Sequence, residues 1–288
     1  MKVFLVDGTY ELFRHHFGIP EAERVTSTAG ATRGVLNSVL TLIGQGATHI
    51  GVATDQVIES FRNQMWPGYK TSAGMPPELL AQFPLLEQTL AAMGVMVWPM
   101  VELEADDGLA SAAAVCAADP AVEQVVICTP DKDLAQCVVG GRVVQVDRRR
   151  ELVYDEEGVI AKFGVPPRSI PDYLALVGDS ADGFPGIPGF GAKSAAAVLT
   201  RYGSIEEIPA APPWDCRVRS TPQLAATLAD KRDLALLFKD LATLRVDPTI
   251  LESVDDLRWE GPTPLFTDVC AGLEAPWLAE KAERAAPA

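Results

Sequence analysis

Nine carboxylates lie in short clusters along this chain of 288 residues, and most follow a run of apolar, β-branched residues. They are Asp7, Asp55, Glu104, Asp106, Asp107, Asp131, Asp133, Asp179 and Asp182. Such runs are typical of buried strands, and open α/β sheets place their active sites at the carboxyl ends of those strands. So many negative charges in one crevice would repel one another unless divalent cations neutralise them. The pattern therefore predicts metal-assisted phosphate chemistry.

The spacing within the clusters suggests how carboxylates could share an ion. Asp131 and Asp133 follow the apolar run VVICT and are two residues apart, so both side chains emerge on one face if the strand persists. The alternative is a helix N-cap turn with solvated carboxylates. Asp179 and Asp182 are three residues apart in GDSAD, close enough to share an ion directly or through water.

The EADD cluster must span a junction between two elements. Glu104, Asp106 and Asp107 cannot all point the same way on a regular helix, because residues two apart diverge by roughly 200°. They converge only if Glu104 is still extended and a helix begins directly after it. The alternative is a helix N-terminus enriched in acids because of the helix dipole.

The donor set predicts the metal and the reaction. Oxygen ligands with no nearby Cys or His favour Mg²⁺ or Mn²⁺ over zinc. Two such ions, roughly 4 Å apart, would orient and deprotonate a water on one side of a phosphodiester and stabilise the leaving oxygen on the other. Arg62 and Lys70 are suited to stabilising the charge on the scissile phosphate; otherwise they are exposed loop charges. His15, His16 and His49 are expected at the surface or in structural roles.

The first 150 residues alternate between strand-like and helix-like segments, which is the rhythm of a mainly parallel sheet covered on both faces. Strands are expected near 2–6, 49–54, 95–99, 123–129 and 142–147, and helices near 9–16, 32–44, 77–93, 105–117 and 132–138. Residues 56–76 interrupt this rhythm with a long loop that carries basic and aromatic residues, and such loops are often functional.

From about residue 151 the pattern becomes helical. GIPGFGAK has the order G-x-x-G-x-G, follows no strand and completes no Walker motif, so it does not predict a nucleotide site. A turn at a helix N-terminus that grips a DNA phosphate beside Lys193 is the better interpretation.

Residues 223–245 are expected to form one long amphipathic helix, and the Pro- and Ala-rich segment from about 262 is expected to fray.

Composition sets limits on partners and location. The net charge is −15, so any duplex contact must be confined to basic patches, such as the segment Arg142 to Arg150. No apolar run reaches the roughly 18–20 residues of a membrane span, and the N-terminus is not a secretory signal. Five cysteines without a CxxC pair indicate neither disulfides nor zinc, so a cytoplasmic protein with no membrane partner is expected.

The motifs LVDG, SFR, GYK, EADD, TPDKDL, GDSAD and the glycine turn occur together in an order and spacing that resembles the 5′-nuclease family. That family comprises the 5′→3′ exonuclease domain of bacterial DNA polymerase I and the flap endonucleases, and the likeness covers residues 2–245. It implies a PIN-like α/β domain over 1–165, with an arch or gateway loop at about 56–76. A helical subdomain over 166–262 would follow, containing a helix–three-turn–helix at about 178–203, and then a tail over 263–288. With no polymerase domain following, a stand-alone member is expected.

The resemblance also implies roles for individual residues. It assigns Asp7, Asp55, Glu104 and Asp106 to a first metal, and Asp131, Asp133, Asp179 and Asp182 to a second, with Asp107 close by. It assigns handling of the scissile phosphate and flanking bases to Arg14, Arg62, Tyr69 and Lys70. It assigns the grip on duplex DNA to Gly189, Gly191, Lys193 and Ser194, and a bound K⁺ to the backbone of Gly186, Ile187 and Phe190.

The expected function is a monomeric, Mg²⁺- or Mn²⁺-dependent 5′ nuclease that acts on flaps, nicks or 5′ ends of DNA in replication and repair. Two alternatives remain: a structure-specific DNA-binding protein with weak or no catalysis, and a PIN-type ribonuclease. The chain departs from the family at Ala73, where an arginine is common, and at Gly183, where an asparagine is frequent. The first departure is expected to weaken the grip on the 5′ strand, and the second to loosen the turn that carries Asp182.

Overall fold

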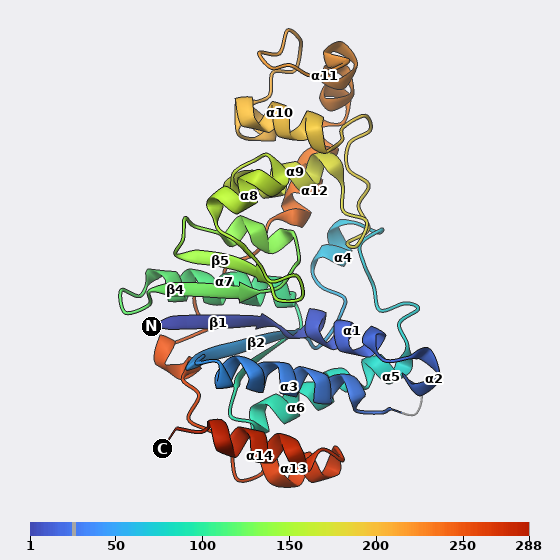
Figure 1. Ribbon diagram of the computed structural model, residues 1–288. Helices are drawn as coiled ribbons and strands as arrows, with labels where there is room; N and C mark the ends of the chain where they lie inside the picture. Colours follow the sequence, from blue (N-terminus) through green and yellow to red (C-terminus); the bar gives the residue numbers. More distant parts are fainter. Residues whose placement is uncertain (25–26, 288) are drawn as a thin grey trace. The chain divides into compact units, whose positions relative to one another are not determined.

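The computed structural model describes residues 1–24 and 27–287, which form two compact units (Figure 1). The sheet unit comprises Met1–Ile58, Ser72–Thr129 and Val246–Ala288, and the helical unit comprises Glu59–Thr71 and Pro130–Arg245. Each unit is therefore built from segments that are distant in sequence. The domain boundary expected near residue 165 stays a prediction.

Four parallel strands form the sheet of the sheet unit, in the order β3-β2-β1-β4. They are β1 (Lys2–Asp7), β2 (His49–Asp55), β3 (Met96–Met100) and β4 (Gln124–Cys128). All seven residues of β2 are buried, which explains its nearly continuous apolar sequence, because a parallel strand is covered on both faces. The expected parallel sheet is confirmed.

Helices pack around these strands. They are α1 (Gly8–Gly18), α2 (Glu21–Arg24), α3 (Gly30–Gly44), α5 (Pro77–Leu80), α6 (Gln82–Ala92) and α7 (Ala105–Ala118). Helix α7 is rich in Ala, and a Cβ added at its glycine, Gly108, would lie 3.1 Å from the sulfur of Met100 in β3. Small residues therefore let α7 approach the sheet closely, directly after the EADD cluster.

The C-terminal segment is ordered, so the expectation that it frays was wrong. After the 3₁₀ helix η4 (Val254–Leu257) it forms α13 (Phe266–Gly272) and α14 (Pro276–Ala285), which lie beside α6 and α3 (Figure 1). Lys281 Nζ donates to Asn37 Oδ1 and to Thr41 Oγ1, each at 2.7 Å. The alanines that suggested a loose tail are instead the small contact residues of a packed helix.

The helical unit begins with a short helix and an antiparallel strand pair, and continues with helices. Its elements are α4 (Arg62–Met65), η1 (Asp133–Cys137), β5 (Val143–Asp147), β6 (Leu152–Tyr154), α8 (Glu156–Phe163), η2 (Pro167–Ser169), α9 (Ile170–Val177), α10 (Ala192–Tyr202), η3 (Ile205–Glu207), α11 (Thr221–Asp230) and α12 (Arg232–Ala242). Leu174, Phe184 and Phe238 are fully buried in its core. Among the described residues, every helix is too short or too polar to span a lipid bilayer.

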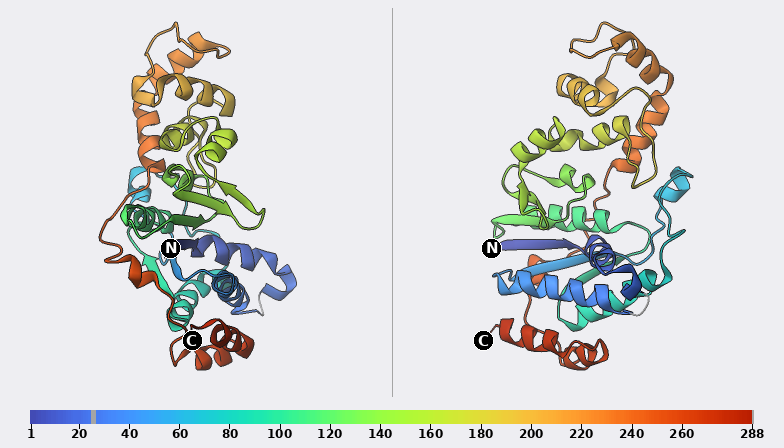
Figure 2. Two further views of the ribbon diagram at one scale, coloured as in Figure 1. Left: turned by 60° about the vertical axis from the view of Figure 1, so that its left-hand side comes forward. Right: turned by 45° about the vertical axis from the view of Figure 1, so that its right-hand side comes forward.

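The single helix expected over 223–245 is two helices, α11 and α12, and this prediction was wrong. The chain leaves helical geometry at Lys231, with φ −114° and ψ 22°. Figure 2 shows α11 and α12 as separate orange helices. Buried apolar residues recur at helical spacing on both sides of the break, with Leu228 before it and Ala235 seven positions later. Periodicity alone therefore could not reveal the bend.

Candidate metal centre

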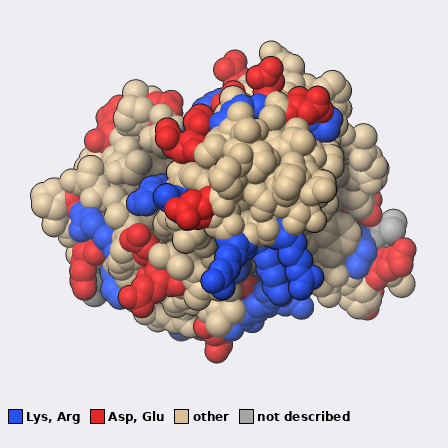
Figure 3. Space-filling model, turned by 90° about the horizontal axis from the view of Figure 1, so that it is seen from above, with Lys and Arg blue, Asp and Glu red and all other residues tan. Residues whose placement is uncertain are grey.

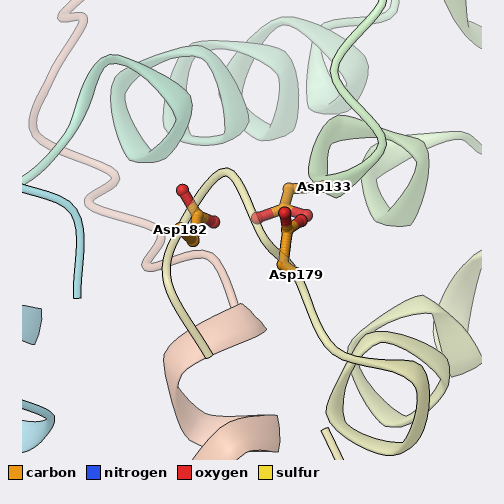
Figure 4. Close-up of side chains that lie close together, drawn as sticks. All are labelled: Asp133, Asp179 and Asp182. Atoms are coloured by element: carbon orange, nitrogen blue, oxygen red, sulfur yellow. The ribbon is translucent and has the colours of Figure 1, made fainter. Parts of the chain in front are cut away.

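Three aspartates of the helical unit converge on one point. Asp133 begins η1, and Asp179 and Asp182 lie in the loop that follows α9 (Figure 4). Each offers a carboxylate oxygen, and the three oxygens lie within 4.8 Å of one another. All three residues are buried. This arrangement can hold one cation through oxygen ligands from two separate segments.

A tight turn holds Asp179 and Asp182 together. The backbone N–H of Asp179 donates to the carbonyl of Phe184 at 2.8 Å, and the N–H of Phe184 donates back at 3.0 Å. Gly183 has φ +84°, and a Cβ there would lie 2.0 Å from the carbonyl oxygen of Gly68. A side chain at position 183 would therefore clash as well as strain the backbone. This close approach requires glycine at position 183, and the expected loosening of the turn stays a prediction.

The electrostatics of the three aspartates favour a bound cation. Burial raises the pKa of Asp133 well above its ordinary value, and the charges of Asp131, Asp182 and Asp179 raise it further. Its Oδ1 is buried and has no hydrogen-bond partner. An orphaned buried carboxylate oxygen is costly, and a divalent cation would satisfy it and remove the repulsion. The residues present therefore fit a divalent metal.

Two lysines neutralise part of this charge. Lys132 Nζ lies 2.6 Å from Asp179 Oδ2, and Lys70 Nζ lies 3.0 Å from Asp182 Oδ1. Burial alone would lower the pKa of Lys132, but the hydrogen bond to Asp179 and the charges of Asp179, Asp133 and Asp131 together outweigh it, and the pKa is raised. Lys132 was missed from sequence, although its place between the two aspartates of TPDKD was a usable signal. Lys132 therefore stays charged beside Asp179, and Lys70 forms an ion pair with Asp182.

Asp131 does not share the position of Asp133. Strand β4 ends at Cys128, so the two side chains do not emerge from one strand face as expected. Asp131 is exposed, and its Oδ1 accepts the backbone N–H of Asp133 at 3.0 Å. It thus supports the turn that presents Asp133. The alternative of an N-cap turn with solvated carboxylates does not hold either, because the N-cap of η1 is Lys132 and Asp133 is buried.

In the sheet unit, Asp7 and Asp55 end the neighbouring strands β1 and β2, as expected. Asp7 Oδ1 accepts the N–H of Tyr10 at 2.7 Å, and its Oδ2 accepts the hydroxyl of Thr129 at 2.8 Å. Asp55 Oδ1 accepts the N–H of Ala105, at the start of α7, at 2.7 Å. These bonds place the first two carboxylates at one edge of the sheet, beside the EADD junction.

The EADD junction has the predicted form. Glu104 is extended, with φ −98° and ψ 162°, and α7 begins at the next residue. Asp107 Oδ2 accepts the N–H of Glu104 at 2.9 Å, and Asp107 is 0% exposed. Asp106 is half-buried on the first turn of the helix. Asp107 therefore caps the helix, whereas Glu104 and Asp106 flank that cap.

Glu87 supports Asp55 and was not singled out from sequence. It is a buried carboxylate on α6 whose Oε1 accepts the hydroxyl of Thr54 at 2.8 Å. Its Oε2 accepts the side-chain amide of Gln56 at 3.3 Å. Glu87 thus holds both sequence neighbours of Asp55. The helix pattern alone made Glu87 resemble a surface charge, so no signal identified it.

Arg62 does not lie where its expected role requires. It is 1% exposed, its Nε donates to the carbonyl of Leu241 at 2.8 Å, and its Nη2 donates to the carbonyl of Thr243 at 3.2 Å. Its guanidinium also stacks on Phe61, 4.6 Å from the ring centroid. A guanidinium enclosed in this way closes the end of α12 and does not reach a phosphate, which corrects the sequence-based expectation.

Tyr69 and Lys70 differ in accessibility. The Tyr69 ring belongs to the core of the helical unit and is 4% exposed, so it does not offer a face to a DNA base, contrary to expectation. The Lys70 side chain is 28% exposed, and its backbone N–H donates to the carbonyl of Asp182 at 3.0 Å. Lys70 is therefore fixed at its backbone and accessible at its tip. The effect of Ala73, which is exposed, stays a prediction.

Arg14 lies on α1 beside a buried acid. Its Nη2 donates to Glu11 Oε2, which also accepts the hydroxyl of Ser38 at 2.9 Å. The Arg14 side chain is half-buried, so Glu11 orients it without enclosing it. His16 and His49 are buried, and burial lowers the pKa of each, so neither resembles an exposed binding residue.

The glycine turn precedes α10, as expected. Gly186 and Gly189 have φ +72° and +88°, and a Cβ at Gly186 would lie 2.4 Å from the nitrogen of Gly178. The N–H of Gly191 donates to the hydroxyl of Ser194 at 3.0 Å, which begins the helix. Lys193 is exposed on the first turn. The K⁺ site assigned to Gly186, Ile187 and Phe190 stays a prediction.

Family models match nearly the whole chain. Residues 2–164 match the 5′-3′ exonuclease N-terminal resolvase-like domain, and residues 165–264 match the 5′-3′ exonuclease C-terminal SAM fold. The chain is 35% identical over 264 residues to DNA polymerase I of Pseudomonas aeruginosa, covering 88% of this chain but only 28% of that protein. It is 33% identical over 263 residues to a 5′-3′ exonuclease of Aquifex aeolicus, covering 90% of this chain and 87% of that protein.

Solved structures share the fold at low identity. The flap endonuclease of bacteriophage T5, solved with DNA and metal ions, superposes with a TM-score of 0.67 at 18% identity, covering 99% of this chain and 98% of that chain. The catalytic core of Rad2, solved with a DNA substrate, has a TM-score of 0.64 at 14% identity, covering 99% and 91%. The expected fold, a mostly parallel sheet flanked by helices followed by a helical domain, is confirmed. Because both family domains match in order over residues 2–264, this chain belongs to the 5′-3′ exonuclease family.

Proposed function

We propose that this protein is a divalent-metal-dependent 5′ nuclease that hydrolyses DNA phosphodiesters at 5′ ends, flaps or nicks. The observation that carries the proposal is the convergence of Asp133, Asp179 and Asp182, with one buried carboxylate oxygen that has no hydrogen-bond partner. The activities named for the Aquifex exonuclease and the T5 flap endonuclease support it. We propose that the protein acts as a monomer in the cytoplasm, in the replication or repair of DNA.

The metal-binding residues follow from the two carboxylate groups. In the helical unit, Asp133, Asp179 and Asp182 would hold one ion; in the sheet unit, Asp7, Asp55, Glu104 and Asp106 would hold another. Because all the donors are carboxylate oxygens, Mg²⁺ or Mn²⁺ is the preferred metal. When bound, these ions supply Lewis-acid stabilisation of charge on the phosphate oxygens and activation of water. We also propose K⁺ at the backbone of the glycine turn, with carbonyl ligands from Gly186, Ile187 and Phe190.

The chain's own side chains orient the site and the substrate. Lys70 presents an accessible ammonium beside Asp182, and can donate to a non-bridging oxygen of the scissile phosphate. Lys132 fixes the carboxylate of Asp179, and Asp131 fixes the turn of Asp133. Asp107 caps α7 and so holds Glu104 and Asp106 in place. Arg14, half-buried on α1, is the remaining cation assigned to DNA.

Cleavage of a 5′-flap DNA labelled at its 5′ end tests the proposal directly. Product is expected with Mg²⁺ or Mn²⁺ and none with EDTA. Asp179→Asn and Lys70→Ala should reduce the single-turnover rate by about 10²–10⁴-fold, because the first weakens the metal site and the second removes a positive charge at the reacting phosphate. The matched control is Asp215→Asn, an exposed aspartate of the helical unit that pairs with Arg201.

Three outcomes would contradict the proposal in different ways. Binding of the flap that persists in EDTA, with no product in either metal, would instead indicate a DNA-binding protein. Cleavage of a matched RNA flap in preference to the DNA flap would indicate a ribonuclease. Full activity of both site variants would exclude this carboxylate group as the reacting centre.

A further inference from the structure

The segment Glu59–Thr71 carries Lys70 and belongs to the helical unit, although the residues before and after it belong to the sheet unit. The short helix α4 lies in this segment, and Trp66 follows it directly. Lys70 forms its ion pair with Asp182, which lies more than a hundred positions later in the chain. The position of Lys70 therefore depends on the contacts that this segment makes within the helical unit.

Two hydrogen bonds join the segment to the turn that carries Asp182. The backbone N–H of Lys70 donates to the carbonyl of Asp182 at 3.0 Å. The indole Nε1 of Trp66 donates to the next carbonyl, that of Gly183, at 3.1 Å. A Cβ added at Gly68 would lie 2.7 Å from the Trp66 Nε1 and 3.1 Å from the Gly183 carbonyl oxygen. The segment and the turn are therefore in close contact, with no space for a side chain between them.

The core of the helical unit fixes the Trp66 ring. Trp66 packs edge-on against Phe238 of α12, with ring centroids 5.1 Å apart and an interplanar angle of 89°. Phe184, which follows Gly183 in the turn, packs on the same Phe238 ring at 5.4 Å. Phe184 and Phe238 are fully buried or almost so. The indole N–H is therefore directed at Gly183 by packing, and the ring cannot turn away without leaving this core.

Asn63 holds the other side of the Lys70 backbone. Its Nδ2 donates to the carbonyl of Lys70 at 2.9 Å, and its Oδ1 accepts the backbone N–H of Ser60 at 2.8 Å. The N–H and the carbonyl of Lys70 are thus both hydrogen-bonded, one to the Asp182 turn and one to Asn63. Only the side chain of Lys70 keeps freedom to move.

We propose that Trp66 is a positioning residue, whose indole N–H, together with Asn63, holds Lys70 and the Asp182 carboxylate in one fixed arrangement. The inference rests on the proposed function and deepens it, because it names uncharged side chains that set how the ammonium meets the metal centre. Trp66 acts through the backbone of Gly183 and not by contact with the reacting phosphate. A displacement of about 1 Å at a reacting group can lower a rate by about 100-fold.

Trp66 and Asn63 are uncharged, so replacing them leaves the electrostatic attraction between protein and DNA unaltered. On the face drawn in Figure 3, the largest group of Lys and Arg lies apart from most Asp and Glu side chains. In a chain of net charge −15, such local groups of cations must supply the attraction to phosphates. Substitutions at Trp66 and Asn63 therefore test the arrangement of the metal centre separately from the affinity for DNA.

The test uses Trp66→Phe, which keeps an aromatic ring and removes the N–H donor. We expect kcat for flap cleavage in Mn²⁺ to fall by about 10–100-fold, as for other groups that orient metal ligands. KM and the Kd for DNA in EDTA should stay unchanged. The matched control is Trp214→Phe, because the Nε1 of this buried tryptophan donates to the carbonyl of Pro209 at 2.9 Å in the same unit. It should keep the wild-type kcat while its Tm shifts as much as that of Trp66→Phe.

Asn63→Ala provides a second variant that does not alter the aromatic core. It should lower kcat in the same way and leave KM unchanged, whereas Ala at the exposed neighbour Gln64 should change neither. In a Lys70→Ala protein, the further loss of rate caused by Trp66→Phe should be smaller than in the wild type, because part of the effect passes through Lys70. Fully additive losses would overturn the positioning role.

Failure of this inference is distinguishable from failure of the proposed function. If the wild type cleaves flaps and both Trp66→Phe and Asn63→Ala keep its kcat, the positioning proposal is wrong and the nuclease proposal stands. Equal falls in kcat for Trp66→Phe and Trp214→Phe would also overturn it, since both would then reflect stability alone. If the wild type cuts nothing, the nuclease proposal fails. Calorimetric titration of Mn²⁺ without DNA then decides the positioning role, which requires at least about tenfold weaker binding in Trp66→Phe than in Trp214→Phe.

Discussion

The Nε of Arg62 donates to the carbonyl oxygen of Leu241 at 2.8 Å, although the two residues are 179 positions apart. Carbonyls near the end of a helix have no partner within it, and a buried guanidinium supplies one here. The bond joins the segment that leads to Lys70 to the end of α12. Arg62 is therefore part of the framework that holds Lys70, and not a group that binds phosphate.

Arg62→Ala should destabilise the protein without removing its chemistry. Loss of the guanidinium leaves buried carbonyls unsatisfied and opens a cavity, so the free energy of unfolding should fall by about 2–4 kcal/mol. In the folded fraction, the single-turnover rate of flap cleavage should stay within about tenfold of wild type. Urea unfolding together with cleavage below the new Tm measures both quantities. The exposed Arg168→Ala serves as the control. Unchanged stability with a rate lowered by several orders of magnitude would restore the phosphate-binding role.

Asp133→Asn should stabilise the metal-free protein while abolishing its response to metal. The buried carboxylate repels Asp131, Asp182 and Asp179, and a neutral amide removes that repulsion. We expect the free energy of unfolding in EDTA to rise by about 1–3 kcal/mol. The increase in Tm on adding Mn²⁺ should disappear. Differential scanning calorimetry with and without Mn²⁺ checks both, and Asp215→Asn, an exposed aspartate of the helical unit, serves as the control. A less stable Asp133→Asn that retains the metal response would contradict the assignment.

Glu87→Ala should act on Asp55 through its two sequence neighbours. Without the carboxylate, Thr54 and Gln56 lose their common acceptor, and the end of β2 becomes less constrained. Loss of such support costs about 10–100-fold in activity or metal affinity in known metal sites. We expect kcat to fall by this amount and the Mg²⁺ concentration that gives half the maximal rate to rise. The Kd for DNA in EDTA should stay unchanged. Gln88→Ala, exposed on the same helix, should change none of these, and equal effects from both variants would exclude a positioning role.

The stability of the protein should fall below pH 6.5 in part because of His49. Burial lowers the pKa of His49, and the positive charge of Arg258 lowers it further. Above pH 6.5 the residue is neutral in both folded and unfolded chains. Below it the unfolded chain binds a proton that the folded chain does not, so the free energy of unfolding decreases, by at most about 1.4 kcal/mol per pH unit, until the lowered pKa is reached.

His49→Gln should therefore flatten this part of the pH profile. Urea unfolding at several pH values between 7.5 and 5 measures the slope. Arg258→Gln removes the positive charge that lowers the pKa of His49 further, so this variant should flatten the pH profile in part. A His49→Gln profile that coincides with the wild-type profile would show that His49 does not contribute.

Removal of residues 265–288 should destabilise the sheet unit. Phe266, Leu278 and Ala282 are fully or almost fully buried, and Arg33 Nη1 donates to the carbonyl of Leu273 at 2.8 Å. Burial of a large apolar side chain contributes about 1.5–3 kcal/mol, so a loss of at least about 3 kcal/mol is expected. Chemical denaturation measures it, with removal of 286–288 alone as the control. A truncated protein as stable as wild type would show that α13 and α14 are dispensable.

The sequence by itself determined the sheet and the position of most carboxylates. Runs of β-branched residues and the small residues of α7 are local signals, and parallel strands bring their carboxyl ends to one edge whatever else surrounds them. For this reason Asp7, Asp55 and the extended Glu104 were predictable. The glycine turn before α10 was predictable on the same local grounds.

Only the tertiary structure decided which polar groups face a ligand and which serve the fold. The motif SFR places an arginine at position 62, but the group that Arg62 binds is the carbonyl of Leu241, far along the chain. The sequence around Arg62 does not show whether it binds a carbonyl or a phosphate. In the same way, Gly183 is required by a backbone that approaches from Gly68. The packing of distant segments determines which polar groups pair. Hydrogen bonds and ion pairs form only between groups that the folded chain brings close together.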